Sequence, residues 1–148
     1  ICPRMRHPKP SLTDHPIVLC QMDEQWSFVG SKAQQRWLCT AFDPLKGRVL
    51  VHALGPRTEQ PLKALLSRLP MKQVDYFLTD RWSAYAKHLP SARHIRSKRF
   101  AQAIERHHLT LRTRLKRLAR KTICFSKSVQ IHDNLIGLFM EKFHYQYV

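Results

Sequence analysis

The segment VDYFLTD at residues 74–80 decides the fold class, because it is a run of strand-forming residues that follows a helical segment. Leucines at 62, 65, 66 and 69 have the spacing of one helix face, with Thr58 as the expected N-cap and Pro70 as the stop. A strand that is reached through a helix usually lies parallel to a neighbour in the same sheet. Residues 74–80 therefore predict an α/β fold.

Three further strands are expected upstream of that helix. Residues 17–29 are largely apolar and end at Gly30, and residues 36–42 form a second strand-like run. The sequence DPLKG at 43–47 is typical of a turn, and residues 48–54 follow it directly. Three strands joined by tight turns predict an antiparallel meander.

The first residues of the chain have a different character. Residues 1–16 contain four prolines among basic and polar neighbours, which is typical of an arm or linker. We therefore divide the chain into a linker or arm at 1–19 and one domain at 20–148. Because the chain begins with Ile1, we expect it to be a piece of a longer polypeptide.

Downstream of residue 80 the pattern alternates again. We expect a short helix at 82–88, a strand near 94–97, a helix from about 100 to 120 and a last helix at 129–143. The order is then β-β-β-α-β-α-β-α-α. It is the order of the ribonuclease-H-like (retroviral-integrase-like) fold, with a mixed five-stranded sheet flanked by helices.

Positive charge is the strongest compositional signal. The 148 residues contain 26 Lys and Arg against 10 Asp and Glu, a formal net charge of +16. Residues 81–130 alone contain 14 basic residues and one acid, a local net charge of +13. Such density favours nucleic acid as the partner over a merely solvated basic face. No apolar run reaches the length of a membrane helix, so we expect no membrane partner.

Cysteine and histidine do not suggest a metal site of the zinc type. The four cysteines lie far apart without a C-x-x-C pair, and none of the nine histidines forms an H-x₃₋₅-H pair next to one. The sequence thus predicts reduced, partly buried thiols and scattered histidines.

Three acidic residues are the candidates for catalysis. Asp23 lies in the first strand, where a buried carboxylate is costly unless a cation or hydrogen-bond donors accompany it. Asp80 ends the fourth strand, where α/β folds place ligand-binding groups. Glu105 is the single acid of the basic stretch, and taken alone it is equally well explained as a salt-bridge hub. Glu24 competes with Asp23, but strand alternation sends their side chains to opposite faces.

Together these acids fit phosphodiester chemistry with two divalent ions. Such chemistry needs three or four converging carboxylates, and the hard ion Mg²⁺ prefers oxygen ligands.

Arg112 lies seven residues after Glu105, which is nearly two helical turns, so both residues share one helix face. Lys116 extends that face.

Four motifs resemble one known family. MDEQW at 22–26, TDRW at 79–82, SKRFAQAIERHHLTLRTRLKRLARK at 97–121 and FSKS at 125–128 resemble the transposase of the smallest bacterial insertion sequences, the insertion-sequence-one family. The resemblance runs from about residue 20 to residue 146. The third motif is long and specific, whereas the first two are short.

The resemblance implies a D-D-E transposase. Its catalytic and metal-binding residues would be Asp23, Asp80 and Glu105, with two Mg²⁺ or Mn²⁺ ions, and its basic residue seven places after the Glu would be Arg112. Basic side chains near the site would position phosphates; the candidates are Lys98, Arg99, Arg106, Arg112 and Lys116. The implied partners are double-stranded DNA, as element ends and target, and further copies of the chain on that DNA. The implied location is the bacterial cytoplasm, in association with the nucleoid.

Two alternatives stay open at this point. A ribonuclease-H-like nuclease or junction resolvase shares the fold and the metals but does not join strands. A non-catalytic DNA-binding fragment of a transposase would share the basic stripe alone. Family members also carry a zinc-binding and helix-turn-helix region upstream; neither is expected in these 148 residues, and residues 1–19 resemble the family only loosely. The end sequence, the target preference and the oligomeric state are not predicted.

Overall fold

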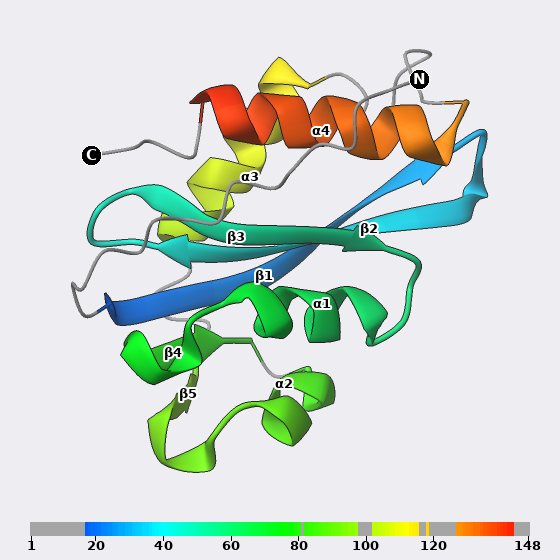
Figure 1. The fold of residues 1–148 in the computed structure, drawn as a ribbon. Coiled ribbons are helices and arrows are strands. Elements are labelled where there is room, and N and C mark those ends of the chain that lie inside the picture. The colour runs from blue at the N-terminus through cyan, green and yellow to red at the C-terminus, as the bar shows by residue number, and fades with distance from the viewer. Residues whose placement is uncertain (1–16, 81, 98–101, 116–117, 119–126, 144–148) are drawn as a thin grey trace.

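A computed structural model describes residues 17–80, 82–97, 102–115, 118 and 127–143. The strands are β1 (Ile17–Val29), β2 (Ser31–Asp43), β3 (Arg48–Gly55), β4 (Val74–Thr79) and β5 (His94–Arg96). The helices are α1 (Gln60–Arg68), α2 (Ser83–His88), α3 (Gln102–Arg114) and α4 (Val129–Phe143), with 3₁₀ turns at Met71–Gln73 and Ser91–Arg93. The predicted order of strands and helices is confirmed (Figure 1).

The five strands form one sheet in the order β3-β2-β1-β4-β5. β1, β2 and β3 are antiparallel neighbours, whereas β4 lies parallel to β1 and β5 lies parallel to β4. The mixed sheet follows from the connections, because tight turns join the first three strands and helices precede the last two. The predicted α/β class and the mixed five-stranded sheet are confirmed.

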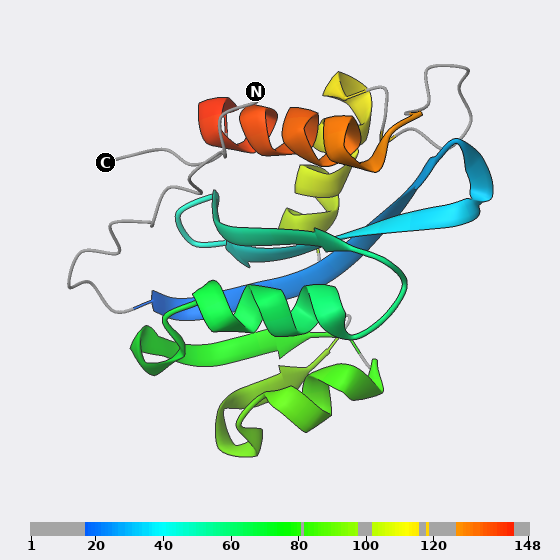
Figure 2. The same ribbon diagram turned by 45° about the vertical axis from the view of Figure 1, so that its right-hand side comes forward.

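Helices cover both faces of the sheet. Figure 1 and Figure 2 show α1 and α2 on one face and α3 and α4 on the other. Adjacent strand residues separate accordingly: Cys39 belongs to the core beneath α1 and α2, and Leu38 to the core beneath α3 and α4. β1 and β2 are therefore sandwiched at their centre, which explains why their sequences are apolar runs rather than alternating ones.

Two connections show how local sequence sets the geometry. Asp43 Oδ1 accepts hydrogen bonds from the backbone N–H groups of Leu45 (3.0 Å) and Lys46 (3.2 Å), which closes the turn predicted from DPLKG. Gly47 has a φ of 65°, a conformation that glycine adopts without steric cost.

Three predicted boundaries need correction. β1 begins at Ile17, which pairs with Val74, so residues 17–19 belong to the sheet and not to the arm. The N-cap of α1 is Glu59 rather than Thr58, although the Thr58 hydroxyl accepts a hydrogen bond from the Gln60 N–H. β2 begins at Ser31, five residues earlier than predicted, because its hairpin with β1 continues nearly to Gly30.

The helix predicted from residue 100 to 120 is α3, which the structure ends at Arg114. The rest of that prediction lies largely outside the described residues. No helix in the described part of the chain combines the length and the apolar character that crossing a membrane requires.

Candidate active site

The parallel pairing of β1 with β4 brings two of the predicted acids together. The paired positions include Gln21 with Leu78, and Asp23 and Asp80 each follow two residues later. In parallel strands this register keeps both residues at the same level along the sheet. One oxygen of Asp23 and one of Asp80 lie within 4.8 Å of each other, in a group that also includes Glu24.

The third predicted acid lines the site from the other layer, although its carboxylate does not belong to the group whose oxygens lie within 4.8 Å of one another. Glu105 lies in the first turn of α3 with an exposed side chain. It lines a cavity of about 200 Å³ that Asp23 and Asp80 also line, between the middle of the sheet and the start of α3. Within the part of the chain that the structure describes, Glu105 forms no salt bridge, so no described cation supports the salt-bridge alternative.

Asp23 occupies an electrostatically unfavourable position for a carboxylate. The pKa of Asp23 is raised to about 6, mainly by burial and in addition by the negative charges of Asp80 and Glu105. The backbone N–H of Glu24, 2.9 Å from Asp23 Oδ1, and the positive Arg112 partly counteract this. Carboxylates that repel one another in a half-buried site are what a divalent cation stabilises.

His108 of α3 contacts the same carboxylate from the helix layer. Its Nδ1 lies 3.7 Å from Asp23 Oδ2, too far for a normal hydrogen bond. Burial, together with the charge of Arg112, lowers the pKa of His108 to about 4. The imidazole is therefore neutral near pH 7, and it does not neutralise Asp23.

Asp80 is held by the backbone that follows it. Its Oδ1 accepts a hydrogen bond of 2.9 Å from the N–H of Trp82, the N-cap residue of α2. This bond leaves Oδ2 and the remaining lone pairs of Oδ1 as acceptors.

Glu24 is a nearby carboxylate that sequence reasoning placed apart from the site. As strand alternation predicts, it contacts the opposite layer, where the Tyr85 hydroxyl of α2 donates a hydrogen bond to Oε2. Burial raises the pKa of Glu24 to about 7, with a further contribution from Asp23 and Asp80. Its proximity to the site was not predicted: one of its carboxylate oxygens lies within 4.8 Å of an oxygen of each of the two aspartates. The only sequence signal was its place next to Asp23.

The predicted DNA-binding residues have different outcomes. Arg106 is exposed on α3, and Arg112 is half-buried on the same helix. Arg112 is close enough to Asp23 to affect its pKa, and its Nε is buried without a hydrogen-bond partner among the described residues. Lys98, Arg99 and Lys116 lie outside the described residues.

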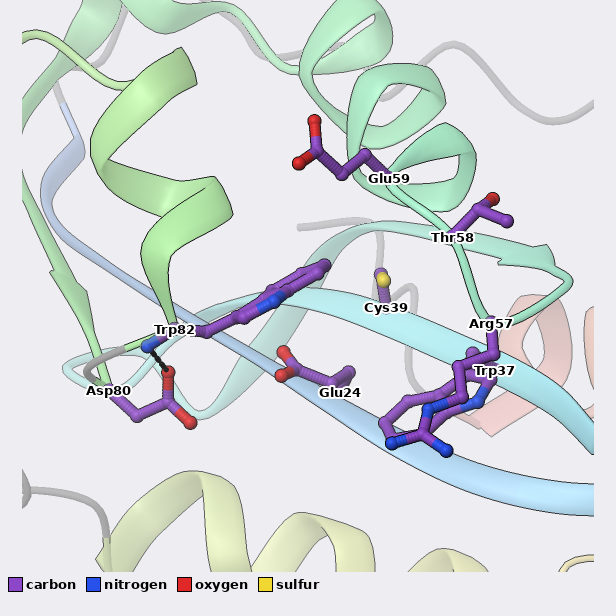
Figure 3. Close-up of a pocket in the computed structure, with 8 residues that line it drawn as sticks. All are labelled: Glu24, Trp37, Cys39, Arg57, Thr58, Glu59, Asp80 and Trp82. Atoms are coloured by element: carbon purple, nitrogen blue, oxygen red, sulfur yellow. Dashed lines mark hydrogen bonds between the residues drawn. The ribbon is translucent and has the colours of Figure 1, made fainter.

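A larger cleft adjoins the carboxylates on the α1–α2 side of the sheet. Its volume is about 560 Å³, and Asp80 lines it as well as the smaller cavity. Figure 3 shows the indole of Trp82 across this cleft, with Glu24 beside it and Trp37 and Arg57 further along. The sequence did not predict this cleft, because its walls come from four separate segments of the chain.

The donor set around Asp23, Asp80 and Glu105 consists of carboxylate oxygens, which fit Mg²⁺ or Mn²⁺ better than a softer ion. The described residues place no cysteine in the smaller cavity. Partial burial, mutual repulsion and free carboxylate oxygens all fit a divalent cation.

Comparison with known proteins agrees with the motifs. Residues 17–146 match the family model for IS1 transposase. The chain is 50% identical over 125 residues to the insertion element iso-IS1n protein InsB of Shigella dysenteriae, covering 84% of this chain and 95% of that protein. It is 47% identical over 130 residues to the IS1 protein InsB of Shigella sonnei (88% and 99% covered) and to the IS1 9 protein InsB of Escherichia coli strain K12 (88% and 78%). The chain therefore belongs to the IS1 transposase family.

Proposed function

We propose that this transposase cleaves and joins DNA at the cavity formed by Asp23, Asp80 and Glu105. The observation that supports this most is that three acids from β1, the end of β4 and α3 line one small cavity. They are far apart in sequence, so only the fold unites them. The element order and the mixed sheet support a ribonuclease-H-like fold for this catalytic domain.

The three carboxylates would hold two Mg²⁺ or Mn²⁺ ions, with Glu24 near enough to act as a fourth ligand. Bound divalent ions supply charge stabilisation at the attacking and leaving oxygens of a phosphodiester. Asp80 is oriented for this role by the Trp82 N–H. The Tyr85 hydroxyl orients Glu24 in the same way.

The reaction has two steps, and in each step one phosphorus–oxygen bond forms while another breaks. Water attacks phosphorus at the end of the element, the bond from phosphorus to the 3′ oxygen breaks, and a 3′-hydroxyl is released. That hydroxyl then attacks a phosphate of the target strand and displaces a second 3′-hydroxyl. No covalent bond to the protein forms in either step, so the side chains serve as ligands and positioning groups.

Basic residues of α3 position the DNA beside the carboxylates. Arg112 lies close to Asp23, and its half-buried guanidinium carries donors that suit a phosphate oxygen. Exposed Arg106 adds positive charge to the same helix. Phosphate contacts of this kind set register and orientation rather than sequence preference.

A two-part DNA assay tests this function. Supercoiled plasmid with Mg²⁺ should be nicked, and a labelled duplex with a pre-cut 3′-hydroxyl end should be joined to plasmid, both only in the presence of the ion. Nicking without joining would identify a nuclease or resolvase instead. DNA binding without either reaction would identify a non-catalytic fragment.

A further inference from the structure

We propose that the 560 Å³ cleft beside the carboxylates binds one nucleobase, unstacked from the DNA next to the reacting phosphate. This inference rests on the proposed function, because it takes the carboxylates to be the reaction site. The volume falls within the range of about 300–1,000 Å³ that is typical of small-ligand sites.

Aromatic rings border the cleft from two directions (Figure 3). The backbone N–H of Trp82 donates a hydrogen bond to Asp80, which fixes the main chain of this residue. Its indole makes an edge-to-face contact with the ring of Tyr85, with ring centroids 5.3 Å apart. Trp37 is fixed within β2, and the Arg57 guanidinium carbon lies 5.9 Å from its ring centroid. Both indoles are half-buried, so each retains surface on which a flat heterocycle can stack.

The charges in the cleft favour a base over a phosphate. Glu24, Glu59 and Asp80 line it, and Arg57 is the cation among the described lining residues. Carboxylates repel a phosphodiester, whereas a nucleobase is uncharged. The hydroxyl of Thr58 accepts the Gln60 N–H at 3.2 Å and keeps its own proton, so it can donate to a base.

The position of the cleft ties its occupant to the reaction. Asp80 lines both the cleft and the smaller cavity, so a nucleotide whose phosphate lies at the carboxylates has its base within reach of Trp82. A base inside a duplex is stacked on both faces and cannot enter. It must leave the stack, which costs least where the base is unpaired.

The test measures DNA binding with Ca²⁺ in place of Mg²⁺, so that a divalent ion neutralises the carboxylates while the readout is binding and not cleavage. Three duplexes are compared that differ at one position: a paired base, an unpaired base and an abasic site. That position is placed either beside a 3′-hydroxyl end or in the middle of an unbroken duplex. In one of the two placements, the duplex with the unpaired base should bind at least about five-fold more tightly than the duplex with the abasic site. A preference beside the 3′-hydroxyl end would mean that the base comes from the cleaved end, and a preference in the unbroken duplex that it comes from the target.

Variants then assign the preference to the cleft. Trp82→Leu and Trp37→Leu should abolish it, Trp82→Phe should keep part of it, and Trp26→Leu should keep it fully. Trp26 is a matched control, because it pairs with Trp37 across β1 and β2 but does not line the cleft. Circular dichroism checks that each variant is folded.

Equal affinity of the unvaried chain for the unpaired base and the abasic site in both placements would overturn the proposal, and this comparison needs no variant. An intact preference in folded Trp82→Leu would overturn it as well. Failure of the chain to cleave DNA with Mg²⁺ would instead contradict the proposed function while leaving this comparison readable.

Discussion

The backbone N–H of Trp82 donates a 2.9 Å hydrogen bond to Oδ1 of Asp80, so the last residue before α2 fixes the carboxylate that borders both cavities. The bond requires an oxygen acceptor but not a negative charge. An amide in place of the carboxylate therefore keeps the bond and removes the charge.

Asp80→Asn should accordingly fold like the unvaried chain but bind Mn²⁺ more weakly, by at least about ten-fold, since even outer-shell changes cost that much at metal sites. Titration with Mn²⁺ monitored by electron paramagnetic resonance measures the affinity. Asp75→Asn is a control in β4, because its exposed side chain is remote from both cavities. Equal Mn²⁺ affinities of the Asp80 and Asp75 variants would remove Asp80 from the metal site.

The raised pKa of Glu24 predicts how stability depends on pH. Its pKa is about 7 in the folded chain against an ordinary 4.5, so between these values the folded state holds more protons than the unfolded state. Stability from this group therefore falls as pH rises from about 4.5 to 7. Glu24→Gln removes this pH dependence. The free energy of unfolding of Glu24→Gln minus that of the wild-type chain should therefore be about 2–3 kcal/mol larger at pH 8 than at pH 4.

Urea denaturation in EDTA at several pH values measures that difference. His108 contributes in the opposite direction, because its folded pKa of about 4 lies below the ordinary 6.5 and its stabilisation is lost as pH falls. Comparing the two chains at each pH cancels the His108 contribution. If the difference in unfolding free energy between the two chains is the same at pH 4 and pH 8, the pKa of Glu24 is not raised in the folded chain.

An ion pair joins the β1–β2 hairpin to α4. Arg36 donates to both oxygens of Asp133, from Nε to Oδ1 at 3.0 Å and from Nη2 to Oδ2. Lysine cannot form this two-pronged contact, so Arg36→Lys should lower the free energy of unfolding by about 1–2 kcal/mol. Urea denaturation checks it, with exposed Lys63→Arg as the control, for which the loss should stay below about 0.5 kcal/mol. A loss equally small for Arg36→Lys would mean that the two-pronged geometry contributes nothing measurable beyond a simple ion pair.

DNA affinity should fall steeply with salt and depend little on sequence, because residues 81–130 have a net charge of +13. Each phosphate contact adds roughly −0.9 to the slope of log K against log salt. Arg112→Ala should make the slope shallower by about one such contact, whereas Lys63→Ala on α1 should leave it unchanged. Fluorescence anisotropy over a salt series measures both. An unchanged slope for Arg112→Ala would show that Arg112 does not contact phosphate.

Local sequence predicted the strands, the crossover and the positions of Asp23 and Asp80, because hydrophobic runs and turn residues act over a few positions. The parallel direction of β4 also follows from the helix between β3 and β4, whereas the register that aligns the two aspartates was not predicted. The proximity of Glu24 and the cleft bordered by Trp37 and Trp82 were not predictable. Both depend on how far strands twist and on loops that meet only in the folded chain. The catalytic role of Asp23, Asp80 and Glu105 stays a prediction.

The most direct test of the three-carboxylate site is Mg²⁺-dependent cleavage by Glu105→Gln, measured together with DNA binding. Glutamine keeps the size of the side chain but removes a negative ligand, so cleavage should fall by at least about 100-fold, while DNA binding stays equal or tightens. Arg112→Ala should do the reverse, weakening binding but leaving slow cleavage at saturating DNA. Near-normal cleavage by Glu105→Gln would contradict the three-carboxylate site and leave Glu105 as a surface charge.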